Sequence, residues 1–138
     1  SDPYHNLIPT EMYNHVNTSH GIIMIFFFLM PVLIGGFGNY LIPLLISLPD
    51  LNLPRLNALS AWLLIPSSIC LVISLYYGSG TGWTFYPPLS NSIFSSSIGT
   101  DFLMFSLHLA GVSSILSSIN FICTIYSVIY FSRNNERI

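Results

Sequence analysis

Few side chains in this sequence are suited to proton, metal or redox chemistry. Most of them stand inside or beside long apolar runs, where a polar group is costly in a membrane and needs a reason. Their types would allow metal ligation by an imidazole, proton uptake by a carboxyl group, and ordering of water by amides and hydroxyls. The candidates are His20, Asn39, Asp50, Arg55, Asn57, His108, Ser113, Ser114, Ser117 and Asn120.

His20 opens the first apolar run. Its neutral imidazole can bind haem iron or another transition metal, and the alternative is an interfacial histidine whose nitrogens hydrogen-bond water. His15 is five residues away in a polar stretch, so one helix of this chain cannot supply both axial ligands of a haem. We expect His108, inside the third apolar run, to be buried and hydrogen-bonded.

Ser113, Ser117 and Asn120 have the spacing i, i+4 and i+7, so they share one stripe of a helix. The stripe could order a chain of water for protons, or its serines could bond their own i−4 carbonyls and serve helix packing. Asn39 and Asn57 could join such a water path or hydrogen-bond between neighbouring helices.

Asp50 lies in the short segment between the first two apolar runs. It could admit protons to a buried path, or be a turn acid paired with Arg55. Asp101 directly precedes the third run and is expected to be a helix N-cap without chemistry.

The elements that must position these residues follow from composition. Among 138 residues 52% are hydrophobic and 6% are charged, against about 25% charged residues in an ordinary soluble domain. Three arginines and no lysine exclude a nucleic-acid binder that relies on phosphate contacts. Residues 21–48, 56–77 and 102–131 form apolar runs, each long enough to cross a bilayer, which takes about 20 residues. We therefore predict an all-α membrane protein with three transmembrane helices.

The three predicted spans divide the chain into seven segments. Arg55, Arg133 and Arg137 all fall on the side of the short turn and the tail, so the positive-inside rule places that side in the cytoplasm or the mitochondrial matrix. Small residues on the first and third spans predict close helix packing within a larger assembly. Those of the third span are Ser106, Ala110, Ser114 and Ser118. The segments are a polar segment 1–17, a span 18–48, a turn 49–55, a span 56–77, a loop 78–100, a span 101–131 and a tail 132–138.

An ordered series of motifs runs through the three spans and the segments between them. They are Thr18-Ser19-His20-Gly21, Gly35-Gly36-Phe37-Gly38-Asn39, Pro49-Asp50, Pro54-Arg55-Leu56-Asn57, Gly80-Thr81-Gly82-Trp83 and Ser106-Leu107-His108-Leu109-Ala110-Gly111-Val112-Ser113-Ser114. In these motifs the sequence, from residue 13 to about 125, closely resembles subunit 1 of the haem–copper oxidase family, in its cytochrome c oxidase branch.

The resemblance implies a role for particular residues. His20 matches an axial ligand of the low-spin haem A, and Tyr13 and Trp83 match positions near the propionates of that haem. Asp50 matches the acid at the mouth of a proton pathway. The polar residues that would hold the water of this pathway are Asn39, Asn57, Ser113, Ser114 and Asn120.

The resemblance also shows what is missing. The family subunit is a bundle of about twelve helices, of which these three would form part. The ligands of copper B and of the high-spin haem A, and the second ligand of the low-spin haem, have no match. The chain is therefore expected to reduce oxygen and translocate protons only as part of a complex. Other polypeptides would supply the rest of subunit 1, beside subunits 2 and 3, cytochrome c and membrane lipid, with no nucleic acid.

The expected location is the mitochondrial inner membrane, crossed several times. We expect a split subunit, and a truncated chain is the alternative. Other hypotheses are a structural fragment without a redox role, a member of the quinol oxidase branch, and a free-standing channel or transporter.

Overall fold

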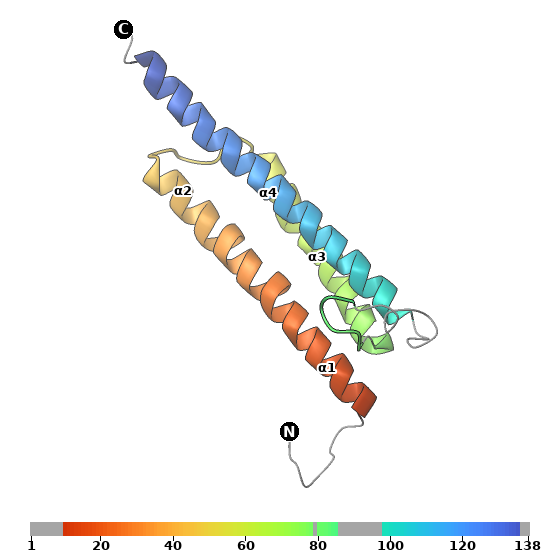
Figure 1. The fold of residues 1–138 in the computed structure, drawn as a ribbon. Coiled ribbons are helices and arrows are strands. Elements are labelled where there is room, and N and C mark those ends of the chain that lie inside the picture. The colour runs from red at the N-terminus through yellow and green to blue at the C-terminus, as the bar shows by residue number, and fades with distance from the viewer. Residues whose placement is uncertain (1–9, 79, 86–97, 136–138) are drawn as a thin grey trace.

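The computed structural model describes residues 10–78, 80–85 and 98–135. Within them the chain forms helices only, and Figure 1 shows that the first four follow one another as a single rod, which we call the first helix. Three rods are long and apolar enough to cross a membrane, which confirms the predicted fold class. Most of the expected loop, residues 86–97, and Arg137 lie outside the described residues. The elements are α1 (Thr10–Ile22), η1 (Ile23–Leu29), η2 (Pro31–Gly38), α2 (Asn39–Leu45), α3 (Pro54–Tyr77) and α4 (Gly99–Asn135).

Two helices are longer than hydropathy indicates. The first helix already begins at Thr10 rather than at residue 18, and α4 continues to Asn135. Each residue added to the end of a helix forms one more hydrogen bond, so the helix continues through polar residues until a helix-breaking sequence ends it. With 37 residues, α4 is about 55 Å long, against a hydrocarbon core of about 30 Å. Its ends therefore extend beyond the apolar layer.

The middle of the first helix is wound as a π-helix in η1 and η2. The amide of Met30 donates to the carbonyl of Ile25, five residues earlier, as this winding requires. Pro31 has no amide hydrogen to donate, and Gly35 and Gly36 have no Cβ that resists rewinding. The winding ends at Asn39, whose amide bonds Gly36 instead. Because of the π-helical winding, Asn39 points to a different side of the helix from the one predicted by 3.6 residues per turn.

The first helix ends in a Schellman motif. Leu48 N donates to Pro43 O at 2.9 Å, and Ser47 N donates to Leu44 O at 3.3 Å. Ser47 has a φ of 57°, a left-handed conformation that glycine usually occupies at this position. The motif satisfies the last carbonyls of the helix and reverses the chain towards α3.

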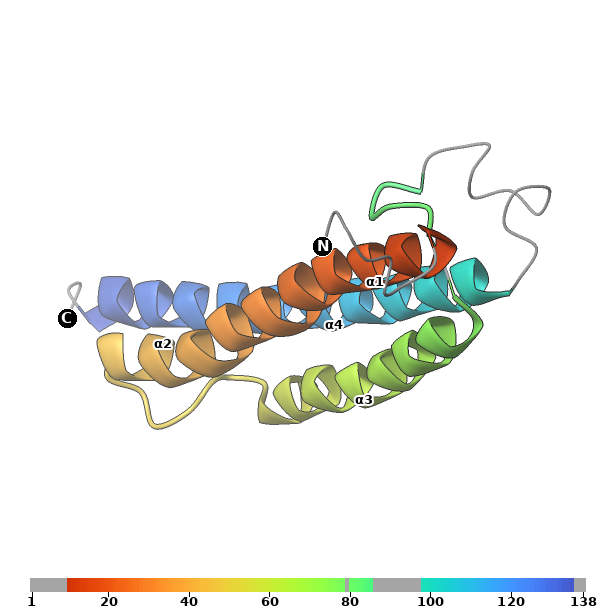
Figure 2. The ribbon, with the colours of Figure 1, turned by 90° about the horizontal axis from the view of Figure 1, so that it is seen from below.

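α3 and α4 lie side by side in an antiparallel pair (Figures 1 and 2). They are joined by what we call the serine seam, formed by Ser60, Ser67 and Ser74 of α3 with Ser113, Ser106 and Gly99 of α4. Ser67 Oγ donates to Ser106 O at 2.7 Å, and Ser106 Oγ donates back to Ser67 O at 2.9 Å. Both rows advance by seven residues, the repeat that keeps two gently crossing helices in register. Small side chains bring the backbones close, as in many membrane helix pairs.

The small face expected on α4 is only partly correct. Ser106 and Ala110 are buried against α3, but Ser118 is exposed and its hydroxyl bonds Ser114 O in its own helix. A step of four residues turns by about 400°, so such a row drifts around the helix, whereas a step of seven stays on one side. The seam therefore continues from Ser106 to Ser113.

The segment after α3 is seated on the first helix. Gly82 N donates to Thr18 Oγ1 at 3.1 Å, and the ring of His15 lies so close to Gly78 that a Cβ there would be 2.5 Å from it. Gly78 has a φ of 87°, which also favours glycine. Nearby, a small core of Ile22, Leu71 and Leu103 forms where all three rods meet.

Most apolar side chains do not reach that core. Of the most apolar window of the first helix only 6% is buried, and of that of α3 only 22%. His108 is exposed on α4, contrary to expectation, because it points away from the two other rods. Faces this apolar suit lipid or further helices.

Candidate functional site

A cavity of about 320 Å³ lies between the first helix and the α3–α4 pair. One part of its wall is apolar and includes Phe26, Ile34 and Leu64. The other part carries amides and hydroxyls from all three rods: Asn39, Asn57, Ser60, Ser113, Ser114 and Ser117. The structure thus brings together four of the six residues predicted for the proton pathway, Asn39, Asn57, Ser113 and Ser114.

Ser60 organises the hydroxyls of this wall. Its Oγ donates to Ser113 O at 2.9 Å and lies 2.6 Å from Ser117 Oγ. A hydroxyl has a single hydrogen, so Ser117 must be the donor to Ser60. Ser113 Oγ in turn donates to Ser60 O at 2.7 Å. These protons are committed to backbone carbonyls and to one another, so the serines by themselves are no proton relay and serve as a polar wall.

Two asparagines join the first helix to α3. Asn39 Nδ2 donates to Asn57 Oδ1 at 3.0 Å, while the buried Asn39 Oδ1 has no partner among the described residues. Asn39 lies at the junction of η2 and α2, so the end of the π-helical winding sets its direction.

Asn120 lies on α4 seven residues after Ser113, beyond the end of the serine seam. It is fully buried and is not part of the cavity wall. Its Oδ1 accepts a hydrogen bond from Leu53 N at 3.2 Å, and its Nδ2 has no partner within the described ranges. An unpaired buried polar atom costs about 1–3 kcal/mol. One such acceptor on Asn39 and one such donor on Asn120 therefore mark places where water would be bound favourably.

Asp50 is exposed on the turn between α2 and α3 and does not line the cavity. Its Oδ1 accepts a hydrogen bond from Leu51 N at 2.8 Å. Both Asp50 and Arg55 are described, and no ion pair between them is found. The carboxyl group thus faces the solvent at the end of the molecule where α3 begins.

His20 stands in the last turn of α1, exposed to the outside of the bundle. Val16, one turn before it on the same side, is 50% exposed, and Met24 in η1 is 48% exposed. Gly21 beside it has open space where a Cβ would be. An imidazole on an open apolar surface is the donor that a flat, apolar macrocycle such as haem requires. Across the described part of the chain, no three His, Cys, Asp or Glu side chains gather to hold a metal ion.

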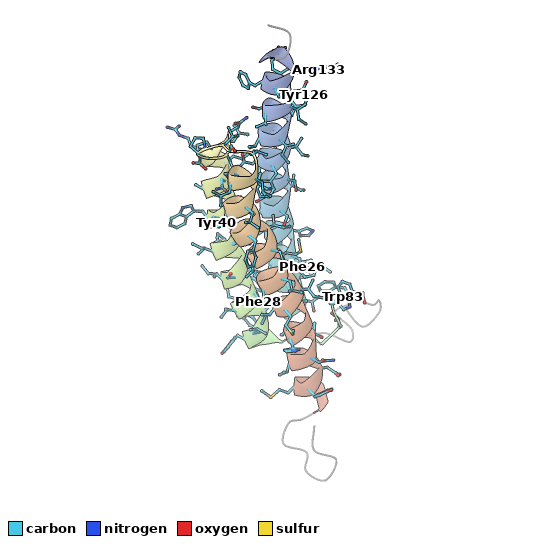
Figure 3. The ribbon with its side chains drawn as sticks, turned by 90° about the vertical axis from the view of Figure 1, so that its left-hand side faces the viewer. Phe26, Phe28, Tyr40, Trp83, Tyr126 and Arg133 are labelled. Carbon is cyan, nitrogen blue, oxygen red and sulfur yellow. The ribbon has the colours of Figure 1, made fainter. Side chains whose placement is uncertain are left out.

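Tyr13 and Trp83 are both exposed, and Figure 3 shows Trp83 projecting from the segment after α3. Tyr13 lies two turns before His20 on α1, which places both on one side of the helix. No hydrogen bond or ring contact between described residues joins Tyr13, His20 and Trp83. Trp83 is held near the first helix through its neighbour Gly82, whose backbone N is bound to Thr18.

Two features of the site were missed in the sequence. Ser60 is the centre of the hydroxyl cluster, and the signal for it was the spacing of seven between Ser60, Ser67 and Ser74. Asn52 binds α4 through three hydrogen bonds. No local pattern indicates that role, because it depends on how the turn folds back against a helix about 70 residues later.

Comparison with known proteins identifies the family of this chain. Residues 2–136 match the family described as cytochrome c and quinol oxidase polypeptide I. The chain is similar to cytochrome c oxidase subunit 1 of Pecten maximus, with 50% identity over 122 residues, which are 86% of this chain and 26% of that protein. The Yarrowia lipolytica subunit 1 is 51% identical over 117 residues, which cover 83% of this chain and 22% of the relative. The Plasmodium falciparum subunit 1 is 52% identical over 119 residues, or 83% and 25% of the two chains. The chain thus spans about a quarter of the length of these relatives.

Proposed function

Because the chain belongs to the family of cytochrome c and quinol oxidase polypeptide I, we propose that it supplies one haem ligand and the outer part of a proton pathway to a cytochrome c oxidase. The names of its relatives favour the cytochrome c branch over the quinol branch. The other haem and copper ligands would come from polypeptide outside this chain. Subunits 2 and 3, and cytochrome c as electron donor, would complete the complex in the mitochondrial inner membrane.

The cavity carries the proton-pathway part of the proposal. Six polar residues face a cavity of about 320 Å³ in helices that are otherwise apolar, a volume that holds several water molecules at about 30 Å³ each. The unpaired atoms of Asn39 and Asn120 give such water an acceptor and a donor. Asp50 lies at the exposed end of the same three rods and would collect protons from the matrix. Water would carry protons from Asp50 past Asn120 and into the cavity.

His20 carries the haem part. Its imidazole has an open apolar surface around it, which fits the low-spin haem A that the family binds. Tyr13 and Trp83 would hydrogen-bond the propionates through their phenol and indole groups. The bound haem would supply one-electron transfer, and the residues of this chain would hold and orient it. The high-spin haem A and copper B would have no ligand here.

The first experiment isolates the native assembly in mild detergent with an antibody to this chain. Its reduced-minus-oxidised absorbance spectrum is recorded, and mass spectrometry identifies the polypeptides that co-purify. We expect a haem A signature together with polypeptide that carries the missing copper ligands. If haem A is absent from a complex that contains those ligands, the haem role of His20 is wrong and a purely structural role replaces it.

A further inference from the structure

The turn between α2 and α3 is bound to α4 by hydrogen bonds that the proton pathway does not explain. Figure 1 shows the turn leaving α2 and passing behind α4 before α3 begins. Asn52 and Leu53 of the turn meet one stretch of α4, and we call this set the turn clamp. Its α4 members are Asn120, Cys123, Thr124 and Ser127.

Asn52 is the centre of the turn clamp. Its Nδ2 donates to Ser127 Oγ at 2.7 Å and to Cys123 O at 3.3 Å, which uses both hydrogens of the amide. Its backbone N donates to Thr124 Oγ1 at 3.2 Å. A single residue of the turn is thus held at three points of one helix.

The second half of the turn clamp involves Asn120. Leu53 N donates to Asn120 Oδ1 at 3.2 Å, and Thr124 Oγ1 donates to Asn120 O at 2.7 Å. The Thr124 hydroxyl therefore bonds both Asn52 and Asn120, since it accepts from one and donates to the other. Asn120 and Thr124 are fully buried, so the bond between them is shielded from competing water, whereas the bonds from Asn52 N and Leu53 N are only partly buried.

Asp50 is fixed through this arrangement. It is two residues before Asn52, its Oδ1 is bonded to Leu51 N, and Leu51 is buried. Without the Asn52 side chain, the turn would keep the bonds of its two backbone amides to Thr124 and Asn120 but would lose both bonds of the side-chain amide to Cys123 and Ser127. The carboxyl group would then be held less firmly relative to Asn120. Placement to within a fraction of an ångström is what such transfer groups need.

We propose that Asn52 is a positioning residue. It holds the Asp50 carboxyl group in place relative to Asn120, so that protons pass efficiently from Asp50 to the water bound at Asn120. This proposal rests on the proposed role of Asp50. Asn52 itself would touch no transferred proton, because both of its amide hydrogens are committed to α4.

Proton uptake by the assembled oxidase tests the proposal. Asn52→Ala removes both side-chain hydrogen bonds to α4, and both are exposed, so each contributes little. We expect it to slow uptake by roughly 3- to 10-fold, with an unchanged haem spectrum. In the double variant with Asp50→Asn, the loss of Asn52 should add nothing, because Asn52 acts through Asp50. An additional slowing in the double variant would overturn the proposal.

Ser127→Ala is the second variant, in case Asn52→Ala does not assemble. It removes only the 2.7 Å contact of the amide and should give a smaller slowing. Its matched control is Ser118→Ala, since Ser118 lies on the same helix and bonds only Ser114 O. If the assembled Ser127→Ala enzyme takes up protons as fast as the Ser118→Ala enzyme, the proposal is wrong.

A labelling experiment separates this inference from the role of Asp50. The thiol introduced by Asp50→Cys is treated with a maleimide from the matrix side, with and without Asn52→Ala. We expect the labelling rate to change when the clamp is removed, whether or not residue 50 carries protons. An unchanged rate contradicts the positioning role, whereas normal proton uptake in Asp50→Asn alone contradicts only the proposed function.

Discussion

The imidazole of His20 and the carboxyl group of Asp50 occupy opposite ends of the molecule, and both are exposed. Neither depends on a neighbouring titratable side chain for its place. His20 is presented by one helix on an apolar surface, while Asp50 is presented by a turn whose next residue is buried. Their proposed roles therefore separate cleanly by substitution.

His20→Leu should abolish the low-spin haem signal, because leucine has no nitrogen to bind iron and otherwise suits the apolar surface. The reduced-minus-oxidised spectrum of the assembled variant is the measurement. His15→Leu is the control on the same helix, since its ring packs on Gly78 and should be replaceable without loss of haem. A normal low-spin signal in assembled His20→Leu enzyme would contradict the ligand role.

Asp50→Asn should slow proton uptake by roughly 100-fold, the lower end of what positioned proton-transfer groups contribute. Asparagine keeps the shape of the side chain but cannot take up a proton. Asp101→Asn, an exposed acid in the first turn of α4 at the other end of the bundle, should leave uptake unchanged. The measurement is the rate of proton uptake at constant haem content. Equal loss of haem in the Asp50 variant would indicate a folding role instead.

Among the elements, α3 and α4 form the best-connected unit, because the serine seam joins them directly and the turn clamp binds the turn just before α3 to α4. The first helix is held more lightly, by Asn39 to α3 and by the segment after α3 at Thr18. The cavity lies along this lighter contact. Rigid pairing of α3 with α4 thus gives the polar wall a fixed shape.

Ser67→Val tests the serine seam. Ser67 is fully buried between the helices, and valine has two methyl groups in place of the hydroxyl, so the bulkier side chain must force the helices apart, at a cost of about 1–3 kcal/mol. Its neighbour Ser68 is exposed and bonds Leu64 O in its own helix, which makes Ser68→Val a matched control. We expect the thermal inactivation temperature of the assembled complex to fall in the first variant and not in the second. The reverse order would contradict the seam.

At the scale of the whole molecule, the two described arginines share one end. Arg55 stands in the first turn of α3 and Arg133 in the last turn of α4, and Figure 3 shows Arg133 at the end far from Trp83. The antiparallel pairing brings these two turns to the same end of the bundle. By the positive-inside rule, this end, together with Asp50, would face the matrix in the proposed orientation.

This orientation can be tested with a maleimide that does not cross membranes. The thiol from Thr84→Cys should be labelled in mitoplasts, and that from Asn134→Cys in inside-out inner-membrane particles. Both positions are exposed and lie at opposite ends of the bundle. The unaltered chain is the control, since Cys70 and Cys123 lie within helices. Labelling with the opposite sidedness would contradict the proposed path of protons from the matrix.

The sequence by itself determined the fold class, the three spans, the end at which the arginines gather, and most residues of the polar wall. These properties depend on local composition: apolar length decides what can cross a membrane, and an isolated polar residue in an apolar run is visible without a structure. Asn39, Asn57, Ser113 and Ser114 were found in this way.

Only the tertiary structure decided which faces meet. The spacing of four on α4 predicted a small-residue contact, but the crossing of two particular helices selected the row with a spacing of seven, in which Ser106 meets Ser67 and Ser113 meets Ser60. The π-helical winding that directs Asn39, and the clamp between Asn52 and residues about 70 positions later, likewise arise from contacts between distant segments. Local periodicity cannot encode them, because several faces of each helix are equally apolar and the choice between them is made by the partner.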